Sequence, residues 1–97
     1  MNVSFTPQAV DDLRSIHSHI AEYDPNTADR IISRIRQAID ILAAFPLLGR
    51  QGVVAGSREL AIAGLPYTIV YSATTATHID ILTVIHQRRQ YPPLNED

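Results

Sequence analysis

The chain has 97 residues, of which 45% are hydrophobic and 19% are charged, and its net charge is −2. This length predicts a single domain over residues 1–97, because chains divide into domains only at greater lengths. The absence of cysteine excludes disulfides and thiolate metal sites. All eight basic residues are arginine, and the acidic balance argues against a protein that grips nucleic acid through its phosphates.

Nothing in the sequence predicts a membrane or secretory role. The first residues lack the basic region and the apolar run of a signal peptide. Apolar runs are broken by charges, glycine or proline, and none approaches the roughly 18 residues of a membrane span. We therefore expect a cytoplasmic protein.

The first half of the chain predicts one short strand and two helices. Residues 2–5 alternate polar and apolar side chains, as a strand does. Thr6-Pro7 and Asp24-Pro25 each place a capping side chain before a proline, which is typical of helix N-termini. Apolar residues then recur at three- and four-residue steps, predicting one helix over about 7–22 and a second that ends at Phe45-Pro46. The tight turn between them predicts an antiparallel helical hairpin.

The second half predicts a loop, three strands and an irregular tail. Residues 46–57 hold three of the four glycines and predict the loop. Strand patterns follow over 58–63, 67–72 and 79–86, and their short connections favour antiparallel neighbours. The expected fold class is α+β: an N-terminal strand, the helical hairpin, and a three-stranded antiparallel meander that completes one sheet.

The predicted strands carry apolar residues on both faces of the sheet. In the last strand, three isoleucines alternate with Leu82, Val84 and His86, and the middle strand places Val70 opposite its tyrosines. Two helices cover one face only, so the other face is predicted to be a partner surface. The alternative is that residues 46–57 or the C-terminal tail fold over it.

No pattern assembles an ordinary catalytic or metal site. His17 and His19 point about 200° apart on a helix, and His78 and His86 lie about 26 Å apart along a strand. No phosphate loop or Gly-x-Ser-x-Gly turn is present. Asp11-Asp12 are interpreted as acidic residues favoured by the helix dipole. We expect no metal, no cofactor and no hydrolase triad.

A polar cluster over residues 86–91 follows the last strand, and Arg58 opens an earlier one. Its arginines, histidine and tyrosine can bind phosphates, transfer protons or anchor a protein interface. Alternatively, the cluster is a solvated strand end whose arginines pair with acidic groups. Chemistry alone leaves both interpretations open.

Four segments carry a resemblance to a known family. Residues 57–60 (SREL), 65–71 (LPYTIVY) and 81–91 (ILTVIHQRRQY), with the opening FTPQA at 5–9, resemble the ParE/RelE toxin superfamily of type II toxin–antitoxin systems. The resemblance implies a compact toxin of the bacterial stress response, held inactive by a cognate ParD-like antitoxin. Such an antitoxin wraps the toxin and binds DNA through a separate domain, and it would cover the apolar sheet face. The predicted antitoxin-binding residues are Val70, Leu82, Val84 and His86.

The superfamily contains RelE-like nucleases, which cut messenger RNA on the ribosome, and ParE-like poisons of DNA gyrase. RelE-like nucleases usually carry an arginine directly after the aromatic residue of the middle strand, where this chain has Thr68. The change removes a cation that would stabilise transition-state charge. There is no lysine, the loop before Arg58 offers only Arg50 as a cation, and a net charge of −2 suits ribosomal RNA poorly.

We therefore predict a ParE-like gyrase inhibitor with no catalytic residues and no direct nucleic-acid binding. The predicted target-binding residues are Arg58, Arg88, Arg89 and Tyr91. Two alternatives stay open. One is a RelE-like messenger RNA endonuclease that uses His86, Arg88, Arg89 and Tyr91. The other is a non-toxic protein that binds its antitoxin and acts only in autoregulation of their operon.

Overall fold

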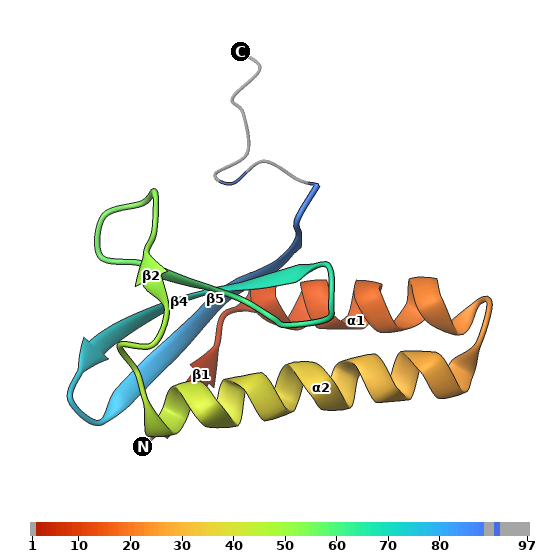
Figure 1. Cartoon of the computed structure of the whole chain (residues 1–97), viewed down its shortest axis with the longest axis horizontal. Helices are drawn as coiled ribbons and strands as arrows, with labels where there is room; N and C mark the ends of the chain where they lie inside the picture. Colours follow the sequence, from red (N-terminus) through yellow and green to blue (C-terminus); the bar gives the residue numbers. More distant parts are fainter. Residues whose placement is uncertain (1, 89–90, 92–97) are drawn as a thin grey trace, which may run out of the picture.

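The computed structural model describes residues 2–88 and 91, in which two helices lie on one side of a five-stranded sheet (Figure 1). The elements in chain order are β1 (Asn2–Phe5), α1 (Pro7–Ala21), α2 (Pro25–Ala44), β2 (Arg50–Gln51), β3 (Arg58–Ala61), β4 (Tyr67–Thr75) and β5 (His78–His86). The predicted α+β fold is confirmed. The sheet has one more strand than predicted, because Arg50–Gln51 pairs with β3 inside the predicted loop.

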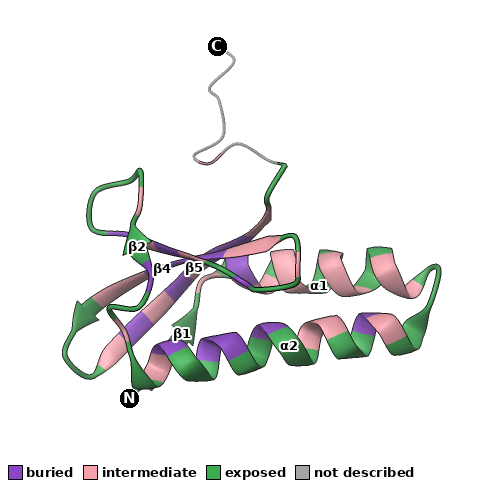
Figure 2. Cartoon of the chain, viewed as in Figure 1, coloured by how far each residue is buried: buried purple, intermediate pink, exposed green. Residues whose placement is uncertain are grey.

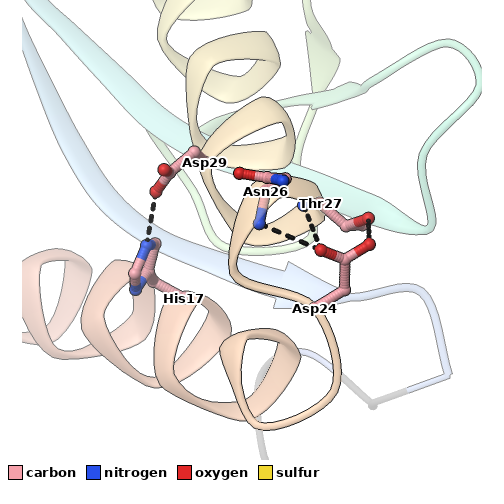
Figure 3. A network of polar contacts seen from close by, with 5 residues as sticks. All are labelled: His17, Asp24, Asn26, Thr27 and Asp29. Atoms are coloured by element: carbon pink, nitrogen blue, oxygen red, sulfur yellow. Dashed lines mark hydrogen bonds and ion pairs between the residues drawn. The ribbon is translucent and has the colours of Figure 1, made fainter.

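Both helices begin at the predicted caps. The Thr6 side chain accepts a hydrogen bond from the Ala9 N–H at 3.1 Å, and Asp24 caps α2 in the same way. Each cap precedes a proline in the first turn, where the missing N–H removes no helical bond. Figure 3 shows Asp24 at the turn between the helices and His17 of α1 beside Asp29 of α2. Nε2 of His17 and Oδ1 of Asp29 are 2.9 Å apart.

The sheet order is β1-β5-β4-β3-β2. β1 pairs with β5 in parallel, and the remaining neighbours are antiparallel. The parallel pair joins the first strand of the chain to the last, after the helical hairpin has carried the chain across one face of the sheet. None of the described helices is both long enough and apolar enough to cross a membrane.

The core lies between the hairpin and one face of the sheet, and Figure 2 shows the buried residues of α2 on the side towards the sheet. β5 does not alternate regularly. Val70 pairs with Thr83 whereas Tyr71 pairs with Ile81, so Leu82 is an extra residue in a β-bulge. The bulge resets the alternation, and Val84 joins Ile81 in the core. The prediction that Val84 points away from Ile81 is therefore wrong.

The prediction of an uncovered apolar sheet face is also wrong for the described chain. Val70 is fully buried, and Thr83 opposite it is 7% exposed. Large apolar side chains are exposed instead at the end of α2 and in the segment that follows: Ile41, Phe45, Leu47, Leu48, Val53 and Val54. Of the predicted irregular tail, Gln87 and Arg88 form a turn, and only Tyr91 is described beyond them.

Candidate functional site

A groove of about 590 Å³ separates α1 from the ends of β4 and β5. One wall comes from α1 and the other from the two strand ends and the turn after them. Its lining residues are Gln8, Asp11, Asp12, Ser15, Ile16, His19, Tyr67, Val84, His86 and Arg88. The groove is open to solvent and mixed in charge, so it suits a polar partner group better than an enclosed small molecule.

The bulge in β5 shapes one wall of this groove. Beyond Leu82 it places His86 opposite Tyr67, and the two rings meet edge to face with centroids 5.5 Å apart. The backbone N–H of Arg88 donates to Nδ1 of His86 at 3.1 Å. A neutral ring then carries its proton on Nε2. His86 can therefore donate a hydrogen bond, but its lone pair on Nδ1 is already occupied.

Asp12 forms hydrogen bonds with the edge of β5 just beyond the last residue that pairs with β1. Its carboxylate accepts hydrogen bonds from the Thr83 hydroxyl and, at 3.0 Å, from the Val84 N–H. The Thr6 hydroxyl donates to the Leu82 carbonyl beside them at 2.7 Å. No acidic residue lies in the first turn of α1, and the dipole acts mainly there. The interpretation of Asp12 as an acidic residue favoured by the helix dipole is therefore wrong. Its carboxylate accepts hydrogen bonds from the part of β5 that β1 does not pair with.

Arg58 lies away from this groove. Its Nη1 donates to the Gly49 carbonyl at 2.7 Å, and its partner on β4 is Tyr71. Tyr71 is four residues from Tyr67, about 13 Å along the strand. Arg58 therefore holds the turn after α2 and does not join His86.

The other predicted target-binding residues lie at or beyond the end of β5. Arg88 is exposed and lines the groove. Tyr91 is half-buried, and Arg89 lies outside the described residues. His86 and Arg88 thus line the same groove, and Arg58 lies outside it.

The four predicted antitoxin-binding residues do not form one exposed surface. Val70 is fully buried and Val84 is 3% exposed, so the folded chain already covers both. Leu82 and His86 are half-buried. For the three residues on β5, the bulge separates Leu82 from Val84 and His86, whereas strict alternation along the sequence would have placed all three on one face.

The turn after α2 is clamped by a buried tyrosine. The Tyr71 hydroxyl donates to the Pro46 carbonyl and accepts from the Gly49 N–H, both at 2.8 Å. A Cβ at position 49 would lie only 2.6 Å from the Tyr71 hydroxyl, so glycine is required by close packing. The clamp fixes a turn on which Leu47 and Leu48 remain 68% and 54% exposed. No sequence motif pointed to this contact.

Two local pairs of polar side chains lie on the strands away from the α1–β5 groove. Glu59, 9% exposed, lies 3.4 Å from Arg50 and accepts from the Val53 N–H at 3.3 Å. His78 and Asp80 form a pair at 2.9 Å on β5. Across the described part of the chain, no three histidine, aspartate or glutamate side chains are grouped to hold a metal ion.

Comparisons with known proteins agree with this architecture. The family model for the ParE toxin of the type II toxin–antitoxin system parDE matches residues 3–91. Y4kP of Sinorhizobium fredii, named as a candidate toxin, is 38% identical and aligns over 93% of this chain and 92% of its own. The toxin RelE2 of Caulobacter vibrioides is 33% identical over 90% of this chain and 96% of its own.

Solved structures show the same fold. The chromosomal ParDE toxin–antitoxin system of P. aeruginosa matches with a TM-score of 0.78 and 25% identity, covering 89% of this chain and 95% of that one. A YoeB/ParE toxin from Agrobacterium tumefaciens matches with a TM-score of 0.62 and 17% identity, covering 89% of this chain and 98% of that one. The fold and these matches define a toxin of a type II toxin–antitoxin system. Within that class, the chain belongs to the ParE toxin family.

Proposed function

We propose that this toxin inhibits DNA gyrase in the cytoplasm and is neutralised by an antitoxin. The observation that carries the choice of target is Thr68, which stands where RelE-like nucleases carry an arginine. Thr68 is half-buried on β4 and pairs with Ile85 across the sheet. A threonine there supplies no cation to a phosphate, so the contribution of that guanidinium to transition-state stabilisation is missing.

The groove beside Thr68's strand supports the same choice. Among the described residues that line it, Arg88 is the one permanent cation, and it shares the groove with Asp11 and Asp12. Two carboxylates weaken the attraction of this groove for an RNA backbone. The occupied Nδ1 of His86 also makes that ring a poor general base.

The exposed apolar segment supports the antitoxin partner. Phe45 and Leu47 are 65% and 68% exposed, and Val53 is 74% exposed. Several large apolar side chains exposed over one short stretch are typical of a protein-binding surface. The related P. aeruginosa system carries a toxin and an antitoxin together.

The test uses purified toxin in two assays run side by side. We expect it to inhibit supercoiling of relaxed plasmid DNA by gyrase and to leave messenger RNA intact on translating ribosomes. Antitoxin added in equimolar amount should restore supercoiling. Ribosome-dependent cleavage with unaffected gyrase would overturn the proposal in favour of a RelE-like nuclease. Activity in neither assay would leave antitoxin binding and autoregulation as the function.

A further inference from the structure

The two flanks of α2 have different neighbours. One flank contacts α1 through the His17–Asp29 pair. On the other flank, Arg34 reaches the β3–β4 turn, where its Nη2 donates to the Ala63 carbonyl at 2.6 Å. Exposed residues recur at three- and four-residue steps along this outer flank, forming one row about 22 Å long. The row consists of Arg30, Arg34, Gln37, Ile41 and Phe45.

The N-terminal half of the row is cationic. Arg30 and Arg34 line a groove of about 390 Å³ with Ile31 and Leu65 at its apolar parts, and none of its described lining residues is acidic. Within the described chain, neither arginine lies within 4.0 Å of a carboxylate, whereas Arg50 does. Two arginines that form no ion pair with a described carboxylate thus belong to a chain whose net charge is −2.

Neutral acceptors orient both guanidinium groups. Nη2 of Arg30 donates to the Thr27 hydroxyl at 3.0 Å, and Arg34 is held by Ala63. Asp24 accepts a hydrogen bond from the same Thr27 hydroxyl at 2.8 Å. Hydrogen bonds from Thr27 chiefly lower the pKa of Asp24, and the charge of Arg30 also lowers it, but the Asp24 and Arg30 side chains form no ion pair within 4.0 Å. Each guanidinium has five N–H donors, so donors remain free for a ligand. Orientation by neutral groups leaves the positive charge available at low ordering cost.

The C-terminal half of the row is apolar. Ile41 and Phe45 are 49% and 65% exposed, and the surface continues onto Leu47 and Leu48. The Tyr71 clamp holds these leucines in place through Pro46 and Gly49. The outer flank of α2 therefore changes from cationic to apolar along its length.

We infer that the antitoxin binds this outer flank with a segment that is acidic at one end and apolar at the other. Its carboxylates pair with Arg30 and Arg34, and its apolar side chains cover Ile41, Phe45 and the clamped turn. Charge complementarity fixes the direction of the segment along α2. The length of the row corresponds to about 15 helical or about 7 extended residues. The inference rests on the proposed function for the identity of its partner.

The test measures the affinity of the toxin for the antitoxin produced from the adjoining reading frame. The variant R30E/R34E reverses the charge on the outer flank. The matched control R14E/R36E makes the same charge change at two exposed arginines outside the row. A single arginine anchor contributes about 2 kcal/mol at an interface, or about 30-fold in Kd. We expect R30E/R34E to raise Kd at least about 30-fold, and the control to raise it less than about 3-fold.

Two further measurements keep the result interpretable. Because Arg34 also bonds the β3–β4 turn, the neutral variant R30Q/R34Q and thermal melts separate lost binding from lost folding. The variant I41S/F45S should weaken binding without changing its salt dependence, whereas R30Q/R34Q should flatten the salt dependence. Equal effects of R30E/R34E and its control would overturn the inference, as would failure of the wild-type toxin to bind this antitoxin.

The outcome is independent of the gyrase proposal. Free R30E/R34E toxin should inhibit gyrase as the wild type does, since the row lies outside the α1–β5 groove. If the wild-type toxin fails to inhibit gyrase while antitoxin binding follows the expected pattern, the target is wrong and the docking surface stands. If gyrase is inhibited and both charge-reversal pairs bind alike, the docking surface is wrong and the target stands.

Discussion

Replacing Tyr71 with phenylalanine tests how the fold presents the turn after α2. The substitution removes one hydroxyl and leaves the ring, which is fully buried in the core. The Gly49 N–H then loses its acceptor and the Pro46 carbonyl loses its donor. Gly49 is itself buried, so water cannot replace the lost acceptor without opening the turn.

The expected loss of stability follows from the Gly49 N–H and the Pro46 carbonyl, which lose their hydrogen-bond partner. A buried donor or acceptor left unsatisfied costs about 1–3 kcal/mol. The buried Gly49 N–H contributes most of this, and the half-buried Pro46 carbonyl contributes less because water can reach it. We expect Tyr71→Phe to lower the free energy of unfolding by about 2–3 kcal/mol. In a domain of this size, that loss lowers the melting temperature by roughly 8–24 °C.

Urea titration measures this change, with Tyr67→Phe as the matched control. Tyr67 is half-buried on the same strand, and no hydrogen bond of its hydroxyl is described. Its loss should change stability by less than about 0.5 kcal/mol. Gly49→Ala, which places a Cβ against the Tyr71 hydroxyl, should destabilise as Tyr71→Phe does. Equal stability of Tyr71→Phe and Tyr67→Phe would refute the clamp.

Two further predictions concern the helix cap and the end of β5. Hydrogen bonds from the hydroxyl and backbone N–H of Thr27 hold the pKa of Asp24 below its ordinary value of 3.8, so the cap stabilises the fold fully above pH 3.8 and loses this effect as the pH falls through the lower folded pKa. Asp24→Asn should therefore lose less stability than the wild type between pH 6 and pH 2.5. Acid titrations of unfolding that give parallel curves for the two proteins would contradict this. Replacing Arg88 and Arg89 with alanine should leave the melting temperature nearly unchanged, because the charge of the exposed Arg88 contributes little to stability. The same variant should abolish growth inhibition by toxin expressed without antitoxin, and full toxicity would show that the two arginines do not bind the target.

Local chemistry made the helices and most strands predictable. Thr6-Pro7 and Asp24-Pro25 define helix starts through contacts within three residues, which the sequence displays directly. The predicted end at Phe45-Pro46 agrees with an α2 that ends at Ala44 and is capped by Phe45. These features depend on neighbours along the chain, so the fold class follows from them.

The details that the sequence did not reveal depend on contacts distant in the chain. The bulge at Leu82 arises from pairing between β4 and β5, and no residue type in β5 marks it. Arg58 donates to the carbonyl of Gly49, nine residues earlier, and no local sequence pattern displays this contact. Asp12 likewise bonds β5 across 71 residues. Sequence patterns identified polar residues near a candidate site, but partners in the folded chain decide which of them are free.

The arrangement of the two grooves bears on how one antitoxin can neutralise the toxin. Leu65 lines the groove that contains Arg30 and Arg34, and Tyr67 lines the groove that contains His86 and Arg88. Leu65 and Tyr67 are two positions apart with only Pro66 between them, about 7 Å of extended chain. An antitoxin segment whose acidic end lies on Arg30 and Arg34 can therefore be continued past the β3–β4 turn towards the groove that contains Arg88. Binding on the flank of α2 and blocking of the α1–β5 groove are thus compatible with one continuous peptide.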